Sequence, residues 1–181
     1  MKNVFFILAI LSVASVHSQR FLSKNAFIKF YSYTPLEKIE AVNNTAACIL
    51  DASTGNVEIS VLNTAFQFKK ALMQQHFNEN YMESSKFPKA KFKGKVNELS
   101  KIYFDKPGTY KVDVSGELNM HGATNNITIC VIVVVDGNGN ISGETKFNIK
   151  PEDYNIKIPN LVKDNIAKEI EITAKADLKK M

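Results

Sequence analysis

The chain has 181 residues, of which 45% are hydrophobic and 23% are charged, and its formal net charge is +5. These proportions are those of an ordinary globular domain, so they exclude a disordered chain, a collagen and a disulfide scaffold. The positive charge comes from lysines dispersed among acidic residues, and Arg20 is the sole arginine. This pattern argues against nucleic acid as a partner, because nucleic-acid-binding proteins usually present a clustered, arginine-rich face.

The first 18 residues, MKNVFFILAILSVASVHS, have the pattern of a secretory signal peptide. Lys2 precedes an apolar run, and small residues lead to a predicted cleavage between Ser18 and Gln19. The run is shorter than the roughly 20 residues that a membrane-spanning helix needs. We therefore expect residues 1–18 to be removed, and residues 19–181 to form a single periplasmic or secreted domain.

Most of the remaining chain alternates apolar and polar residues, as β-strands with one buried face do. The alternation is clearest from Tyr110 to Met120, where every second residue is apolar or glycine. The DGNGN sequence at 136–140 predicts a hairpin turn between two strands. In chain order, the predicted strands are 27–33, 46–50, 56–68, a segment starting at 87, 101–104, 110–120, 127–135, 141–149 and 170–178.

Residues 69–85 depart from this alternation, because their apolar residues recur at intervals of three to five. This spacing predicts a short inserted helical segment that ends before Phe87-Pro88. About eight strands with hairpin connections predict an all-β, mainly antiparallel fold that closes into a barrel or a sandwich. An eight-stranded barrel either is filled by side chains or holds one small ligand, and periodicity does not separate these cases.

The sequence contains no arrangement of residues typical of a catalytic or metal site. It has no HExxH, CxxC or GxSxG motif, and His76 and His121 stand apart from other metal ligands. We therefore predict that the protein is not an enzyme and has no metal or resident cofactor. Cys48 and Cys130 lie in apolar, strand-like segments, which favours two buried free thiols over a disulfide.

Three motifs, in order along the chain, resemble the YceI-like family of bacterial exported proteins. They are KFPKAKF at 86–92, GELNMHGAT at 116–124 and FNIKPEDY at 147–154. The resemblance implies an extended, lipocalin-like antiparallel barrel whose apolar interior binds long-chain lipids. The chain departs from the family pattern in having no tryptophan, and in placing Asn80 where an acidic residue often precedes the aromatic Tyr81. Residues 20–45 match the family least well.

Alternating strand faces and the helical segment supply candidate residues for an apolar interior. The candidate ligand-binding residues are Phe68, Leu72, Phe77, Tyr81, Met82, Phe92, Tyr110, Val112, Val114, Leu118, Met120, Ile129, Val131, Val133, Phe147 and Ile149. A long apolar chain gains about 0.8 kcal/mol of binding energy for each buried CH₂ group, so such a wall needs no fixed charge.

The resulting hypothesis is an exported carrier that holds a polyisoprenoid, an isoprenoid quinone or a fatty-acid derivative and performs no catalysis. Two alternatives stay open: a barrel with a solid core that acts through its outer surface, and a redox partner linked to a quinone or haem. The protein is not expected to span a membrane. Transient contact with a membrane and formation of a homodimer are left open.

Overall fold

The computed structural model describes residues 19–181, so the predicted signal peptide at 1–18 lies outside the described residues. The described part contains nine strands and one α-helix. They are β1 (Arg20–Tyr33), β2 (Lys38–Asp51), β3 (Asn56–Leu62), β4 (Gln67–Phe68), α1 (Ala71–His76), β5 (Lys89–Val96), β6 (Gly108–Met120), β7 (Ala123–Val135), β8 (Ile141–Ile149) and β9 (Ile170–Lys180). Short helical segments are η1 (Asn63–Ala65), η2 (Phe77–Tyr81, a π-helical turn), η3 (Leu99–Lys101), η4 (Pro151–Tyr154) and η5 (Asn160–Asn165).

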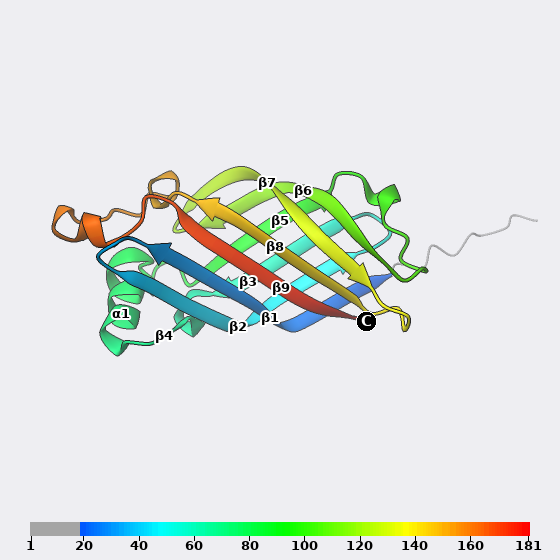
Figure 1. The fold of residues 1–181 in the computed structure, drawn as a ribbon, viewed down its shortest axis with the longest axis horizontal. Helices are drawn as coiled ribbons and strands as arrows, with labels where there is room; N and C mark the ends of the chain where they lie inside the picture. The colour runs from blue at the N-terminus through cyan, green and yellow to red at the C-terminus, as the bar shows by residue number, and fades with distance from the viewer. Residues whose placement is uncertain (1–18) are drawn as a thin grey trace, which may run out of the picture.

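Eight of the strands form a closed antiparallel barrel (Figure 1). Their order is β1-β9-β8-β7-β6-β5-β3-β2, and pairing between β1 and β2 completes the ring. The two-residue β4 pairs with β2 beyond the end of β3. The predicted all-β, mainly antiparallel barrel of about eight strands with a short helical insertion is therefore confirmed.

Strand alternation decides which side chains face the interior. On β7, Ile129, Val133 and Val135 are buried, whereas Cys130 and Ile132 lie on the exposed face. The register with β6 is unbroken over the whole length of both strands, so the inward residues of the two strands lie opposite one another. This is the expected result when one face of an antiparallel sheet is apolar, because a slip of one residue would expose the whole apolar set.

The end of the barrel opposite α1 is filled by side chains. Phe21, Leu50, Val96, Ile141 and Leu178, each from a different strand, are buried there. The loop after η3 closes this end, since its Ile102 is also buried in the same core cluster. We call this part of the molecule the packed end; in Figure 1 it is the end that carries the C-terminus.

The structure differs from the predicted strands at four places, and one of these is β7, which begins at Ala123 and not at residue 127. The strand expected at 56–68 stops at Leu62, where η1 turns the chain before β4. The short strand expected at 101–104 is instead η3 and a loop, because this segment caps the packed end and pairs with no strand. The first two strands begin earlier than predicted, at Arg20 and Lys38, and irregular register between Ser23 and Ile28 interrupts the alternation in β1.

Both cysteines are free, but only one of them is buried. Cys48 on β2 faces the core, whereas Cys130 on β7 faces outward and is exposed. The expectation of two buried thiols is therefore wrong for Cys130, because its position in the alternation of β7 is an outer one. Desolvation by burial raises the pKa of the Cys48 thiol to about 11.

Thiol labelling of the folded protein should distinguish the two cysteines. At pH 8, one equivalent of a reagent such as DTNB is expected to react quickly, because the thiolate is the reactive form and Cys48 remains a buried thiol. Cys130→Ser should remove the fast reaction, and denaturant should release the second thiol in the wild type. Two equally fast thiols in the native protein, or none before reduction, would contradict this arrangement.

Candidate ligand-binding cavity

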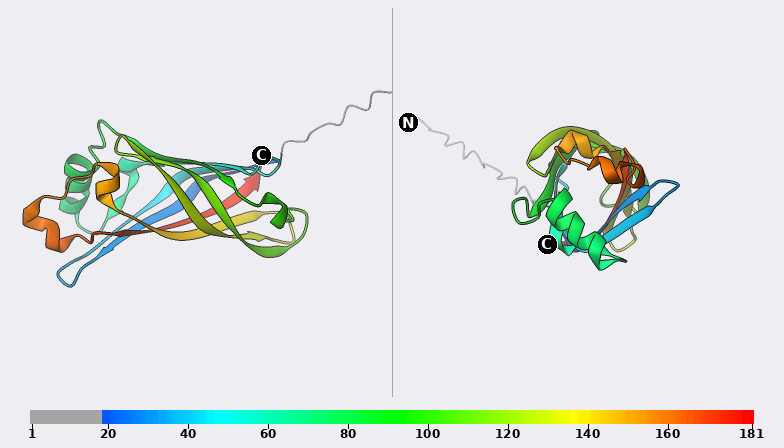
Figure 2. Two further views of the ribbon diagram at one scale, coloured as in Figure 1. Left: turned by 90° about the horizontal axis from the view of Figure 1, so that it is seen from above. Right: turned by 90° about the vertical axis from the view of Figure 1, so that its left-hand side faces the viewer.

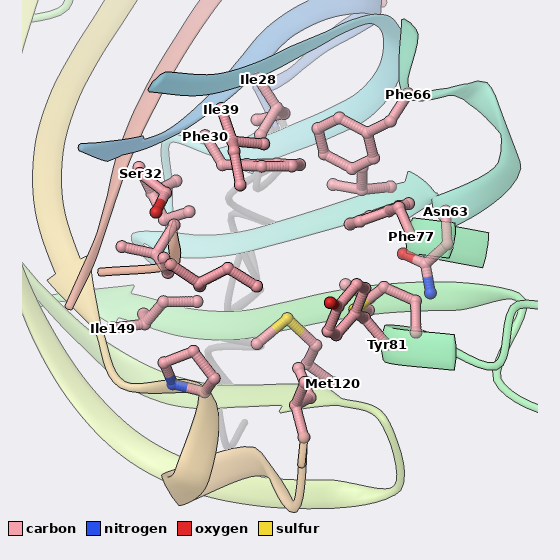
Figure 3. A pocket seen from close by; sticks show the side chains of 18 of the residues that line it. Ile28, Phe30, Ser32, Ile39, Asn63, Phe66, Phe77, Tyr81, Met120 and Ile149 are labelled. Atoms are coloured by element: carbon pink, nitrogen blue, oxygen red, sulfur yellow. The ribbon is translucent and has the colours of Figure 1, made fainter. Parts of the chain in front are cut away.

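The barrel encloses a cavity of about 470 Å³ at the end that carries α1 (Figure 3). We call it the main cavity. All eight barrel strands contribute side chains to its wall, and helical turns and loops contribute the remainder. Its volume lies within the range of roughly 300–1,000 Å³ that is typical of small-molecule sites. A second, smaller void of about 90 Å³ reaches into the packed end, where its lining includes Leu50, Val96, Ile102, Ile141 and Leu178.

Two segments flank the main cavity at the end of the barrel. The view along the barrel from this end in Figure 2 shows α1 on one side and the η4–η5 segment on the other. From the first segment, Leu72, Met73 and Phe77 line the cavity, and from the second, Ile156 and Val162 do so. Apolar side chains from both segments therefore complete the wall that the strands begin.

Four phenylalanines form one wall of the main cavity. Phe77 from η2 contacts Phe30, Phe66 and Phe68, with ring centroids 5.3, 5.5 and 5.1 Å apart. Each such aromatic pair contributes about 0.5–1.5 kcal/mol beyond the burial of its surface. The cluster fixes η2 against β1 and β4, so the helical segment is packed against the strands as a part of the wall.

His121 connects the two flanking segments. Its Nε2 lies 2.8 Å from Oε2 of Glu83, which follows η2, and its Nδ1 lies 3.1 Å from the carbonyl oxygen of Tyr154 in η4. Its ring also packs against Phe87. Both imidazole nitrogens are thus engaged, and since a carbonyl oxygen only accepts, Nδ1 carries a hydrogen. A haem bound by two histidines does not fit this arrangement, because His121 has no nitrogen left to ligate iron.

The polar part of the lining is small. The buried Ser32 hydroxyl accepts a hydrogen bond from the Ala167 N–H (2.8 Å), and the Thr145 hydroxyl donates to the Cys130 carbonyl (2.7 Å). Burial raises the pKa of the Tyr81 hydroxyl, which therefore stays neutral. The ionic side chains of Glu37 and Lys70 pair with each other at 3.3 Å, and both retain contact with solvent.

The candidate residues from the sequence fall into three groups in the structure. Those that line the main cavity are Phe68, Leu72, Phe77, Tyr81, Met82, Phe92, Leu118, Met120, Ile129, Phe147 and Ile149. Val114, Val131 and Val133 line the smaller void. Val112 is buried in the main core cluster without lining either space. Tyr110 is also outside both, and its hydroxyl donates to the carbonyls of Tyr103 and Lys106.

Several lining residues were not among the sequence candidates. Ile28 and Phe30 on β1, Ile59 and Val61 on β3, and Ile172 on β9 all face the main cavity. Their alternation was visible in the sequence, but strand alternation alone gives no reason to prefer one inward face to another. The loop between η4 and β9 carried no periodic signal, so its contribution through Ile156, Ile158, Val162 and Ile166 was not predictable.

Two kinds of feature are absent from residues 19–181. No group of three or more histidine, cysteine, aspartate or glutamate side chains there could hold a metal ion. Over the same residues, no helix has both the length and the apolar composition needed to cross a membrane.

The fold and the cavity together define a lipocalin-like barrel that is closed by eight strands and hollow at one end. The sequence profile of the YceI-like domain matches residues 20–178, and the chain belongs to this family. The resemblance found in the three sequence motifs is thereby confirmed. The match also includes residues 20–45, the segment in which the motifs gave least support.

Three solved structures illustrate the likeness in fold. A polyisoprenoid-binding domain from Saccharophagus degradans, implicated in plant cell wall breakdown, has 15% identity and a TM-score of 0.78, covering 91% of this chain and 100% of that one. BcnA of Burkholderia cenocepacia has 16% identity and a TM-score of 0.68, covering 85% and 96%. The Campylobacter jejuni YceI protein has 15% identity and a TM-score of 0.52, covering 98% and 94%. At such identities the likeness shows the fold alone. No curated protein sequence matches the chain.

Proposed function

We propose that the protein binds and carries a long-chain apolar ligand, namely a polyisoprenoid, an isoprenoid quinone or a fatty-acid derivative, and performs no catalysis. The observation that carries this proposal is the 470 Å³ main cavity, whose wall is almost wholly apolar and is drawn from every strand of the barrel. A barrel with a solid core would fill this space with side chains, as the packed end does. Membership of the YceI-like family, and the polyisoprenoid-binding domain among the similar structures, support a binding or carrier role.

We further propose that the protein acts in the periplasm or outside the cell and meets membranes transiently. The signal-peptide pattern of residues 1–18 supports export. Leu36, Leu72 and Leu161 are 70%, 61% and 96% exposed, and they belong to the β1–β2 turn, α1 and η5. Figure 1 shows these three segments at the same end of the barrel, where the main cavity lies. Exposed leucines beside the cavity favour transfer of ligand at a lipid surface over release into water.

Mass spectrometry of solvent-extracted protein tests the carrier proposal. The full chain would be expressed, and the exported form purified without detergent. We expect a long-chain lipid in stoichiometric amount. A lipid-free protein that also fails to bind added polyprenols and fatty acids would contradict the proposal and favour a barrel that acts through its outer surface. Gel filtration of the same sample would show whether the protein is a monomer or a homodimer.

A further inference from the structure

One polar side chain in the wall of the main cavity is both fixed in place and incompletely bonded. Asn63 begins η1, where β3 ends, and it is only 1% exposed. Its side-chain Nδ2 donates to the Phe87 carbonyl at 2.7 Å, and its backbone N–H donates to the Pro88 carbonyl at 2.9 Å. Because a carbonyl oxygen only accepts, the amide nitrogen must face Phe87, which assigns the other end of the amide as the oxygen.

The Asn63 amide oxygen is the one buried side-chain polar atom, among the described residues, that has no hydrogen-bond partner. Figure 3 shows this oxygen on the side of Phe77 and the cavity. Asn43, which is also fully buried, provides a contrast. Its nitrogen donates to the Leu62 carbonyl at 2.9 Å, and its oxygen accepts from the Thr45 N–H at 2.8 Å.

A buried acceptor without a partner is unfavourable, and native proteins contain few of them. The bond from Nδ2 to the Phe87 carbonyl accounts for a side-chain donor at position 63, but it leaves the amide oxygen without a partner. Asn63 belongs to the wall of the main cavity, so a donor group on a ligand bound there would satisfy this oxygen.

Resting on the proposed carrier function, we infer that the Asn63 amide oxygen accepts a hydrogen bond from the head group of the bound lipid. The cavity then selects long-chain molecules that end in a neutral donor, an O–H or N–H group. It discriminates against ethers, esters and hydrocarbons of equal length, because these leave the acceptor unpaired. An ionised phosphate or carboxylate is disfavoured at this position, since the amide oxygen repels it and a buried charge requires a partner. For redox-active lipids, the same chemistry favours a quinol over its quinone, which carries only acceptors.

A pair of ligands in which a methyl group replaces the donor hydrogen tests the inference. Affinities of 1-hexadecanol and its methyl ether would be measured by displacement of a fluorescent fatty acid from delipidated wild-type protein. We expect the alcohol to bind about tenfold more tightly, the ratio that one retained hydrogen bond supplies. In Asn63→Leu the acceptor is gone, so the ratio should fall to about one while the ether binds at least as well as before.

Asn43→Leu is the matched control, because it removes a buried amide whose oxygen and nitrogen already have partners. It should lower stability and keep the tenfold ratio. Should Asn63→Leu fail to fold, the side-chain carboxamide ¹³C resonance of Asn63 in the wild type should shift with the alcohol and not with the ether.

Three results would overturn the inference, and they separate it from the carrier proposal. Equal binding of alcohol and ether by the wild type would mean that water satisfies Asn63, and would leave the carrier proposal intact. An alcohol preference that persists in Asn63→Leu would assign the donor to another group. Failure of the wild type to bind either probe would remove the inference, and failure to bind added polyprenols and fatty acids as well would remove the carrier proposal on which it rests.

Discussion

Replacement of Gly116 by alanine is expected to lower the free energy of unfolding by about 3 kcal/mol or more. Gly116 on β6 lies directly opposite Gly94 on β5. A Cβ atom at position 116 would stand 2.2 Å from the Lys93 carbonyl oxygen and 2.3 Å from the Gly94 Cα. Both are backbone atoms of the neighbouring strand and cannot rotate away, so the two strands would have to separate.

The glycine pair also provides room for an aromatic ring. A Cβ atom at Gly94 would lie 2.5 Å from Cζ of Phe92, which shows that this ring folds back over the glycine on the inner face. Phe92 lines both the main cavity and the smaller void. Larger residues at this pair would therefore disturb the pairing of β5 with β6 and the wall between the two spaces.

Urea unfolding followed by circular dichroism would measure the effect, with Gly143→Ala as the control. At Gly143 on β8 an added Cβ would meet its nearest atom, Val131 Cγ1, at 3.8 Å, which is an ordinary van der Waals contact. This variant should stay within about 0.5 kcal/mol of the wild type, because alanine also lowers the entropy of the unfolded chain. Similar stabilities for the two alanine variants would refute the close approach of β5 and β6.

Ile127→Asp is expected to weaken the binding of a long-chain ligand by at least about a hundredfold, which corresponds to about 2.8 kcal/mol. Ile127 on β7 lines the main cavity. An aspartate there places a carboxylate in an apolar wall, where it either stays charged without a partner or becomes protonated. Both states lower the affinity of the cavity for an apolar chain.

Ile132→Asp provides the matched control on the same strand. Ile132 lies five residues further along β7, so alternation places it on the outer face, where it is 48% exposed. The same substitution should leave the affinity unchanged there. Displacement of a fluorescent fatty acid gives the affinities, and thermal melting monitored by circular dichroism shows whether both variants are folded. Equal affinities in two folded variants would argue against a ligand inside the main cavity.

Much of the barrel could be predicted from the sequence because strand alternation is a local property. The run from Tyr110 to Met120 established which residues of β6 face inward, and the structure agrees for the whole strand. Alternation does not show how far along the barrel axis an inward residue lies. Leu118 and Met120 reach the main cavity, whereas Tyr110 and Val112, on the same inward face, lie towards the packed end. Which end is hollow depends on where α1 and the η4–η5 segment pack, and these contacts are distant in sequence.

The remaining differences have a similar origin. Asn63 lies within a run of alternating residues that predicted one strand from 56 to 68. Its hydrogen bonds to Phe87 and Pro88, more than 20 residues away, accompany the turn that ends β3. The available signal was an asparagine at a position where the alternation of Val57, Ile59 and Val61 predicts an apolar residue. Its structural role depends on the contacts with Phe87 and Pro88, which the sequence does not show.

If the protein carries a long-chain ligand as proposed, the core at the packed end limits the length of chain that the barrel can hold. A ligand that enters beside α1 must travel towards Phe92 and stop at the filled core behind the smaller void. Each added CH₂ group then increases affinity only until the tail reaches that floor. A longer chain has to fold back or leave part of itself outside the cavity. The side chains at the packed end set the depth of the main cavity, and this depth limits how much of a bound lipid would be shielded from water.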